Sequence, residues 1–312
     1  MMSIIKATGV AYGRLRAPDL DRMEAFLLDF GMVRVARNEN TLYMRGTGPA
    51  QYIHVTEKGS PAFLGMAYRA GSEADLEKLT RVPGASAVEP IDAPGGGKRV
   101  RLRDPDGYLI EVVHGIAPLP ELPITHRHPE QGRTVGVLDR IHMGPARVRS
   151  FGHAVIFTPR LQETLEWYWH VLGLLPSEEV YEGSPDNVLG SFNRCDCGDE
   201  FVDHHVAMFF SNATAGLNHL AFEVVDLDDV FTGHEHLQAR GGYEPLYGVG
   251  RHLLGNQVFD YWGGPWGMVH EHYAHGDLLN ASSGRKRVDI VQGFVSPWGG
   301  EPSEALLNRV VP

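Results

Sequence analysis

The sequence has little cysteine, few basic residues and no long apolar run, and each shortage excludes a class of protein. Its two cysteines, Cys195 and Cys197, stand too close together for an ordinary disulfide, so a reducing cytoplasm is the expected location. Lys and Arg total 28 against 39 Asp and Glu, which excludes the clustered positive charge that nucleic acid binding needs. No apolar run approaches the roughly 18 residues that cross a bilayer, and the first residues lack the apolar segment of an export signal. We therefore expect a cytoplasmic protein that contacts neither nucleic acid nor membrane.

Apolar residues and histidines are plentiful by contrast. Hydrophobic residues make up 43% of the chain, which is enough for packed cores, and 312 residues predict two domains of about 150 residues each. Eleven of the 16 histidines lie at or after His153. This asymmetry predicts a histidine-rich site in the second half of the chain.

The two halves of the chain repeat one pattern. The segment GVAYGRLRAPDLDRMEAFLLDFG from Gly9 resembles FGHAVIFTPRLQETLEWYWHVLG from Phe151, because each has an alternating apolar strand, a proline, an amphipathic helix and a glycine. Further on, both halves contain P-x-G-x-x-x-E, a turn that leads into a strand carrying Glu111 or Glu271. More strand and helix patterns lie between these markers. We therefore predict an α+β fold of four βαβββ modules, two in each half.

The repeat also sets the expected domain limits. We predict an N-terminal pair of modules over residues 1–118, a linker over 119–148, a C-terminal pair over 149–280 and a tail over 281–312. The linker is rich in proline and histidine and has little periodicity, which is typical of a connecting segment. We expect the tail to be irregular and to lie on the surface.

Two histidines and a glutamate on predicted strands of the second half form a candidate metal site. His153 lies in GHAVIF, His219 lies in LNHLAFEV, and Glu271 lies on the last strand of this half. Because side chains alternate along a strand, each of three strands can present one ligand to a shared concave face. Two imidazoles and one carboxylate make the facial triad of non-haem Fe(II) oxygenases, which leaves metal positions open for substrate and O₂. Val155, two residues after His153, should face the same pocket.

A histidine on a strand is more often a hydrogen-bonded core residue than a ligand, and the repeat distinguishes the two cases. The first half has Tyr12 where the second has His153, and Gly65 where the second has His219; only the glutamate recurs. The same scaffold therefore forms without these histidines, which favours a functional role for them. By the same comparison, the first half should bind no metal.

A longer motif connects this site to a known family. The segment RHLLGNQVFDYWGGPWGMVHEHY carries the residues of that motif in order, namely His252, Phe259, Tyr261, Pro265, Gly267 and Glu271. With this motif, residues 5–280 resemble the two-domain (type I) extradiol catechol dioxygenases of the vicinal oxygen chelate superfamily. The resemblance implies cleavage of a catechol-type diol by O₂ at a mononuclear Fe(II), with Mn(II) as the alternative metal. It also implies aromatic compound catabolism and a homo-oligomer.

The resemblance assigns roles to single residues. It makes His153, His219 and Glu271 the metal ligands, and it makes His252 and Tyr261 hydrogen-bonding partners of the substrate.

The resemblance makes His204, which precedes His219 by fifteen residues, the catalytic acid–base. In a regular strand the neighbouring His205 would point the other way, but the sequence alone does not orient that strand. Two other functions stay open within the superfamily: a metal-dependent lyase or isomerase of the glyoxalase type, and a small-molecule-binding protein without activity.

Overall fold

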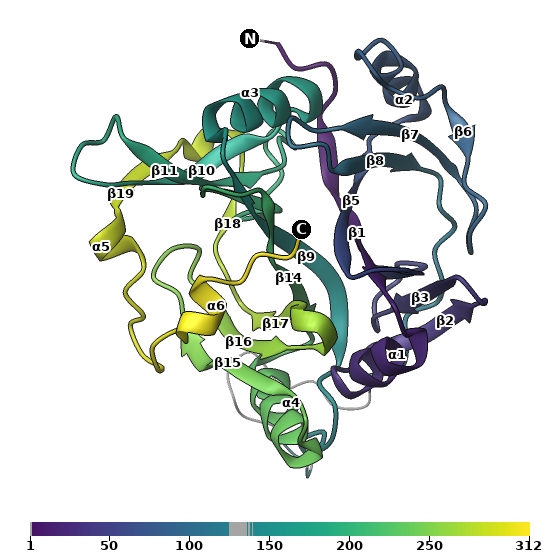
Figure 1. The fold of residues 1–312 in the computed structure, drawn as a ribbon, viewed down its shortest axis with the longest axis vertical. Helices are drawn as coiled ribbons and strands as arrows, with labels where there is room; N and C mark the ends of the chain where they lie inside the picture. The colour runs from purple at the N-terminus through teal and green to yellow at the C-terminus, as the bar shows by residue number, and fades with distance from the viewer. Residues whose placement is uncertain (1, 125–135, 137, 139) are drawn as a thin grey trace.

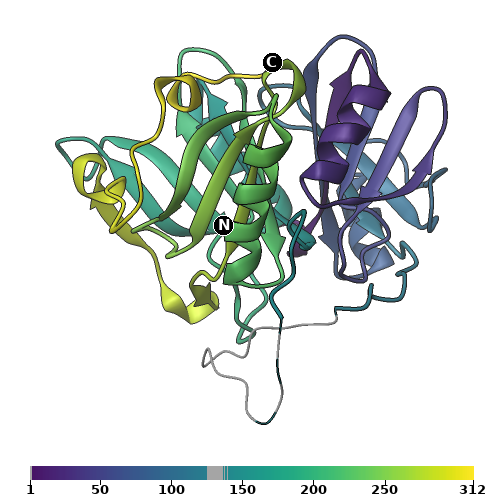
Figure 2. The ribbon, with the colours of Figure 1, turned by 90° about the horizontal axis from the view of Figure 1, so that it is seen from below.

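The computed structural model describes residues 2–124, 136, 138 and 140–312, which form two large mixed β-sheets standing side by side (Figure 1). Each sheet curls into an open barrel, and the helices lie on the outside of the strands (Figures 1 and 2). Part of the predicted linker, residues 125–135, 137 and 139, lies outside the described residues. No helix in the described part of the chain is long and apolar enough to span a membrane.

The first sheet consists of two modules with the same element order. Its strands run β2–β3–β4–β1–β5–β8–β7–β6, so the modules meet where β1 and β5 pair in antiparallel fashion. The elements are β1 (Ala7–Ala17), α1 (Leu20–Asp29), β2 (Val33–Arg37), β3 (Thr41–Arg45), β4 (His54–Lys58), β5 (Ala62–Ala70), α2 (Glu73–Leu79), β6 (Glu89–Pro90), β7 (Lys98–Arg103) and β8 (Leu109–His114).

The second sheet repeats this plan in the order β15–β16–β17–β14–β9–β13–β11–β10–β19. The predicted α+β fold of four βαβββ modules is therefore confirmed, with a short extra strand, β12, in the third module. The elements are β9 (Val148–Thr158), α3 (Leu161–Leu172), β10 (Leu175–Tyr181), β11 (Val188–Arg194), β12 (Val202–Asp203), β13 (Ala207–Ser211), β14 (Gly216–Val224), α4 (Leu227–Arg240), β15 (Glu244–Arg251), β16 (Val258–Gly263) and β17 (Val269–Ala274).

The segment from residue 281 onward is more ordered than the sequence suggests. Strand β19 (Lys286–Asp289) pairs in parallel with β10 and extends the edge of the second sheet. Val311 forms an antiparallel bridge with Leu217 on β14. Trp298 forms a further antiparallel bridge with Arg251 on β15, so the segment is paired with the sheet at three places, and the expectation of an irregular tail is wrong there. The other short elements are η1 (Pro265–Gly267), β18 (Leu278–Leu279), η2 (Ala281–Ser283), α5 (Ile290–Gly293) and α6 (Glu304–Leu307).

Local sequence signals begin and end the helices. Asp19 and Asp226 are N-cap residues whose carboxylates accept hydrogen bonds from backbone amides in the first turns of α1 and α4. Gly173 ends α3 in the left-handed conformation, with φ of 69°, which glycine adopts without steric cost. Leu165 and Tyr168, on the face of α3 that the sequence pattern makes apolar, are both buried.

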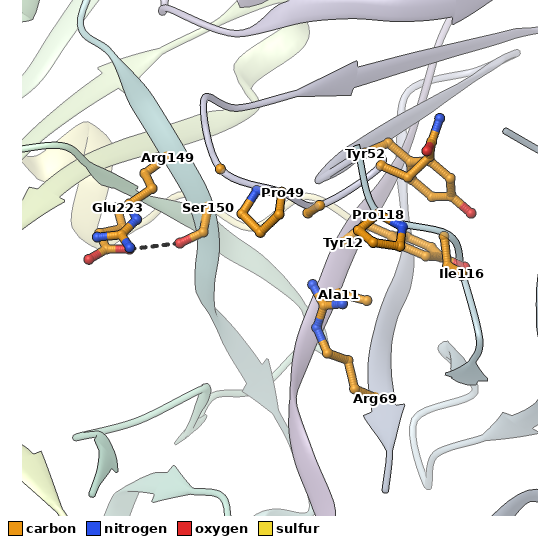
Figure 3. A pocket seen from close by; sticks show the side chains of 13 residues that line it. Ala11, Tyr12, Pro49, Tyr52, Arg69, Ile116, Pro118, Arg149, Ser150 and Glu223 are labelled. Atoms are coloured by element: carbon orange, nitrogen blue, oxygen red, sulfur yellow. Dashed lines mark hydrogen bonds between the residues drawn. The ribbon is translucent and has the colours of Figure 1, made fainter. Parts of the chain in front are cut away.

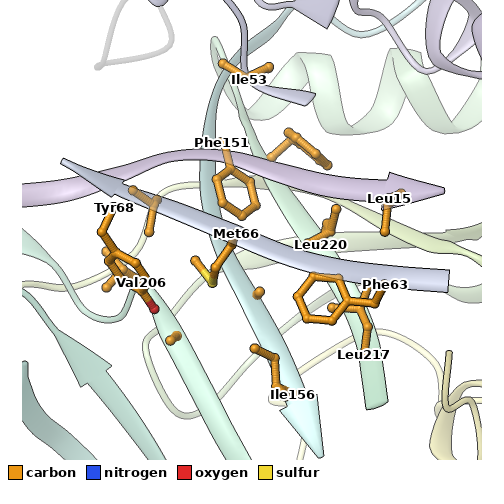
Figure 4. Packing of buried hydrophobic residues seen from close by; sticks show 14 of the residues in the cluster. Leu15, Ile53, Phe63, Met66, Tyr68, Phe151, Ile156, Val206, Leu217 and Leu220 are labelled. Carbon is orange, nitrogen blue, oxygen red and sulfur yellow. The ribbon is translucent and has the colours of Figure 1, made fainter. Parts of the chain in front are cut away.

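A continuous apolar core joins the two sheets (Figure 4). The approach is close, since a Cβ on Gly13 of β1 would lie 2.6 Å from Leu220 Cδ1 of β14. Because side chains alternate along each strand, residues that do not face this core face the interior of a barrel. The core residues seen in Figure 4 include Leu15, Phe63 and Met66 of the first sheet and Ile156, Leu217 and Leu220 of the second.

The register of the first sheet identifies the counterparts of the predicted ligands. Tyr12 on β1 and Glu111 on β8 both pair with Ala67 on β5, and Gly65 lies two residues before Ala67. Gly65 has a φ of 141°, and a Cβ there would lie 1.8 Å from the backbone oxygen of Leu109. The backbone at position 65 therefore excludes a side chain.

Glu111 is buried within a network of hydrogen-bonding and positively charged groups. Tyr12 donates a hydrogen bond of 2.8 Å to Glu111 Oε2. Ion pairs of 3.0 Å and 2.9 Å join the Glu111 carboxylate to Arg14 and Arg99. Burial and the adjacent Glu111 charge hold the pKa of the Tyr12 hydroxyl well above its usual value, so this group remains a donor. Since a buried carboxylate is stable only when it is paired, Glu111 has a structural role here.

A cavity of about 410 Å³ lies beside this network, where the two halves meet (Figure 3). Tyr12 and Tyr52 line it from the first half, while Ser150 and Glu223 line it from the second. Ser150 donates a hydrogen bond of 2.8 Å to Glu223 across β9 and β14 (Figure 3). The cavity therefore belongs to the junction of the halves, and its lining does not include the predicted metal ligands.

The Glu111 network leads to a stability prediction. Glu111→Gln removes the charge that Arg14 and Arg99 share, so it should lower the free energy of unfolding by about 3 kcal/mol, as for a broken buried ion pair. Denaturant unfolding of the purified variant measures this. Glu57→Gln is the matched control, because Glu57 also pairs with Arg14 but is 37% exposed; it should cost less than about 1 kcal/mol. Equal losses in the two variants would contradict the structural role of Glu111.

Candidate metal centre

His153, His219 and Glu271 converge on the inner face of the second sheet. Their ligand atoms all lie within 4.8 Å of one another, and all three residues are buried. Glu271 Oε2 lies 3.3 Å from His153 Nε2 and 3.1 Å from His219 Nε2. These residues lie on β9, β14 and β17, which are neighbours in the sheet. The trio predicted from the sequence is therefore brought together.

The register places this trio where the first half carries its own buried glutamate. His153 on β9 and Glu271 on β17 both pair with Ala221 on β14, and His219 lies two residues before Ala221. This is the arrangement found around Ala67 in the first sheet. The positional correspondence predicted from the repeat is therefore present in the structure.

The donor set of these residues fits a divalent metal ion. Both carboxylate oxygens of Glu271 and the Nε2 atom of His219 are buried, and outside the trio they have no hydrogen-bond partner among the described residues. Unpaired buried groups of this kind are costly, and a cation between them would remove the cost. Two imidazole nitrogens and one carboxylate suit Fe(II) and Mn(II) alike.

The protonation states also suit a metal. Burial alone would raise the pKa of Glu271, but the imidazoles of His153 and His219 beside it hold the pKa well below its usual range. Burial lowers the pKa of His153, so its imidazole is neutral near pH 7. A charged carboxylate and a neutral imidazole are the forms that ligate metals.

His252 and Tyr261 lie beside the trio, as the family resemblance implies. Tyr261 pairs with Glu271 across β16 and β17, and its hydroxyl lies 2.9 Å from His252 Nε2. His252 Nε2 lies 3.9 Å from Glu271 Oε1. Burial lowers the pKa of His252 to about 4, and burial with the nearby Glu271 charge raises the pKa of Tyr261 well above its usual value. Both groups are therefore neutral near pH 7.

The two histidines between β12 and β13 do not alternate as they would in a regular strand. Residues 204–206 belong to neither strand, and the Nδ1 atoms of His204 and His205 lie 3.1 Å apart. The His205 ring packs on His153 with centroids 4.0 Å apart, whereas His204 Nε2 lies 3.0 Å from Glu178 Oε2. Because residues 204–206 interrupt the strand, the alternation of side chains in a regular strand does not apply to this pair, and it is His205 that contacts the His153 ring. The acid–base role of His204 stays a prediction.

Val155 lies where its strand position predicts. It pairs with His219 across β9 and β14 and is buried. It packs in an apolar cluster with Phe192, Met208 and Leu254. This cluster forms an apolar wall on the inner face of the second sheet, next to the ligands.

Three residues near the site were not predicted from the sequence. Glu178 contacts His204, Asn218 Oδ1 lies 2.7 Å from His219 Nδ1, and the Tyr273 ring lies 5.3 Å from the His153 ring. Strand alternation from Glu271 would have indicated Tyr273, two residues further on. No local signal indicates the roles of Glu178 and Asn218, since both depend on contacts in the folded chain.

Comparison with known proteins bears on the second half and on the whole chain. Residues 150–267 match the Glyoxalase/Bleomycin resistance protein/Dioxygenase superfamily. The chain is 29% identical over 303 residues to metapyrocatechase 2 of Cupriavidus necator, covering 95% of this chain and 90% of the relative. It is 25% identical over 278 residues to biphenyl-2,3-diol 1,2-dioxygenase of Sphingomonas paucimobilis, covering 86% and 88%.

Solved structures share the fold across nearly the whole chain. An anaerobic substrate complex of homoprotocatechuate 2,3-dioxygenase from Brevibacterium fuscum has a TM-score of 0.81 at 17% identity, covering 100% of this chain and 94% of that chain. The Mn(II)-bound glyoxalase from Novosphingobium aromaticivorans has a TM-score of 0.80 at 23% identity, covering 96% and 94%. At identities this low, the TM-scores show a common fold and nothing more.

The chain therefore shares its fold with solved dioxygenase and glyoxalase structures, and its buried trio is a candidate site for a divalent metal. The predicted resemblance to the extradiol dioxygenases of this superfamily is confirmed by the superfamily match and the two relatives.

The trio leads to a prediction about metal content. His153→Ala, His219→Ala and Glu271→Ala should each reduce the bound metal to near zero, because two remaining protein ligands do not hold a divalent ion against water. Elemental analysis after anaerobic loading and desalting measures this. His170→Ala, which removes an exposed histidine on α3, is the control and should keep the metal content of the unaltered protein. Full occupancy in His219→Ala would refute the assignment.

Proposed function

We propose that this protein is an extradiol dioxygenase that opens the ring of a catechol-type diol with O₂ at a mononuclear Fe(II) centre, in the breakdown of aromatic compounds. The observation that carries the proposal is the buried cluster of two imidazoles and a carboxylate, with the hydrogen-bonded pair of His252 and Tyr261 beside it. Similarity to two curated ring-cleavage enzymes over most of the chain supports the same reaction class.

The proposed metal would be held by His153, His219 and Glu271. When bound, Fe(II) would lower the pKa of a catechol hydroxyl and supply the redox chemistry that O₂ needs. His252 and Tyr261 are neutral and joined by a hydrogen bond of 2.9 Å, so together they can donate to or accept from the substrate oxygens. The apolar wall around Val155 would keep water away from the reacting groups.

A histidine that takes and returns a proton completes the proposed site, and the two candidates are adjacent. The family spacing favours His204. The packing of the His205 ring on His153 favours His205, which would then be oriented through its Nδ1 contact with His204 and, behind that, by Glu178. We propose that His205 is the acid–base and that His204 positions it.

A lyase of the glyoxalase type is the second candidate, because a glyoxalase shares the fold over nearly the full chain. That glyoxalase contains bound Mn(II), a metal that two imidazoles and a carboxylate also accept. The presence of His252 and Tyr261 next to the three ligands favours the dioxygenase.

We also propose a cytoplasmic homo-oligomer. Cys195 and Cys197 are both free thiols, which fits a reducing compartment. Large apolar side chains such as Phe201 and Leu278 are more than half exposed, which fits a contact between subunits. Light scattering of the purified protein tests the oligomeric state.

Anaerobic reconstitution tests the proposed reaction. The protein is loaded with Fe(II) or, separately, with Mn(II), and it is then mixed with a panel of catechols and O₂. We expect O₂ uptake matched by a yellow ring-opened product for at least one catechol with Fe(II). Fully loaded protein that consumes no O₂ with any catechol, and that converts a thiol adduct of an α-oxoaldehyde instead, would favour the lyase.

The histidine pair gives a second prediction for this reaction. His205→Phe should keep bound metal and bound catechol but lower turnover by about 10²–10⁴-fold, as for a lost general acid–base. His204→Phe should lower turnover less, because it removes an orienting contact. Stopped-flow assays of both variants, normalised to metal content, measure this. The reverse ranking would restore the role that the family spacing gives to His204.

A further inference from the structure

Asn218 occupies a β-bulge directly before a predicted metal ligand. On β14, Leu217 pairs with Ile156 of β9 and His219 pairs with Val155, so Asn218 is an extra residue between two ladder pairs. A bulge takes its extra residue out of the regular pairing and can re-aim a side chain. The Asn218 side chain is buried, and both ends of its amide are hydrogen-bonded.

The hydrogen bonds of Asn218 fix the proton of His219. Asn218 Nδ2 lies 2.9 Å from the backbone oxygen of Leu306 and 3.2 Å from that of Arg309. Carbonyl oxygens only accept, so the amide nitrogen must face them and Asn218 Oδ1 must face His219. Because Oδ1 also only accepts, His219 Nδ1 must carry a proton and donate it. Nε2, the atom that faces Glu271, is then the ring nitrogen left for a metal.

The acceptors of Asn218 belong to the C-terminal segment (residues 303–312), which is itself fixed to the sheet. Val311 and Leu217 exchange two backbone hydrogen bonds, of 2.8 Å and 2.9 Å. The Leu306 side chain is buried in an apolar cluster that includes Tyr261. The C-terminal segment therefore contacts β14 on one side and the Tyr261 cluster on the other.

The first half has the same bulge with a different residue in it. Arg14 pairs with Gly65 and Leu15 pairs with Phe63, so Leu64 is the extra residue there. Where no ligand follows the bulge, its residue is apolar. Where His219 follows, the bulge carries an amide.

We propose that Asn218 is a positioning residue for the metal site, and that the C-terminal segment holds it so that His219 presents Nε2 to the metal. This inference rests on metal ligation by His219, as in the proposed function. It assigns the C-terminal segment, far away in the sequence, a part in metal affinity. Hydrogen bonds to the second nitrogen of a ligating histidine fix its ring and tautomer in other metal sites.

Two variants test the proposal through metal affinity. Asn218→Ala removes the amide, and Gly216→Ala displaces the C-terminal segment while leaving Asn218 intact. A Cβ on Gly216 would lie 2.2 Å from Val310 Cγ1 and 2.9 Å from the backbone oxygen of Val311. Gly248→Ala is the control, because a Cβ there would meet no atom within 4 Å.

Anaerobic competition with a chelator should show that Asn218→Ala and Gly216→Ala each bind Fe(II) about 10–100-fold more weakly, while Gly248→Ala binds as the unaltered protein does. Unchanged affinity in folded Asn218→Ala would overturn the proposal. Unchanged affinity in Gly216→Ala would overturn the part given to the C-terminal segment. If Asn218→Ala does not fold, Gly216→Ala decides alone.

A spectroscopic readout is independent of turnover. In protein loaded with Co(II), the Nδ1 proton of a ligating histidine gives a shifted proton resonance. We expect the His219 signal to exchange slowly with solvent in the unaltered protein and at least about 10-fold faster in Asn218→Ala, as for a buried hydrogen bond lost. Equal exchange rates would overturn the proposal. Protein that cleaves no catechol but shows both effects would refute only the proposed function.

Discussion

A buried carboxylate without an arginine or lysine partner among the described residues is the constraint on which the second half of this protein depends. Glu271 is fully buried, and no arginine or lysine among the described residues forms an ion pair with it. Such a charge is unstable in an apolar interior unless a cation or donors compensate it. The Nε2 atoms of His153 and His219 come within 3.3 Å of it, and an ion shared among the three residues would compensate its charge. The same position in the first half, Glu111, is compensated by two arginines and a tyrosine, so one scaffold contains two solutions to the same electrostatic problem.

The strand that carries Glu271 also joins the two halves. Its neighbours His270 and His272 face the opposite side by strand alternation. His270 Nε2 lies 3.2 Å from His54 Nε2 of β4, and His272 Nε2 donates to the backbone oxygen of Phe30 at 2.7 Å. The first half therefore supports the back of the strand whose front carries the ligand. This packing gives the first half a structural role in support of the second.

The module order and the ligand trio could be predicted from the sequence because both depend on local patterns and on the repeat. The orientation of His205 could not be predicted, because the interruption between β12 and β13 depends on how the folded chain packs. Residues 286–289 were expected to be irregular, but they form strand β19. A short edge strand of this kind forms only where its partner, here β10, is in place, so the local sequence does not indicate it. The contacts of Asn218 could not be predicted either, because its acceptors lie at the far end of the chain.

The glycine at position 65 limits which ligands the first half can carry. Replacing Tyr12 by histidine would restore one imidazole in the first barrel, yet position 65 would still admit no second one, because its φ of 141° and the oxygen of Leu109 leave no room for a side chain. A side chain at position 65 would require a different backbone conformation there and a shift of the strand that carries Leu109. Position 65 therefore excludes a second imidazole sterically, and no single substitution places one there. The two halves of the repeat thus share a fold, but the backbone of the first half does not admit the ligand trio of the second.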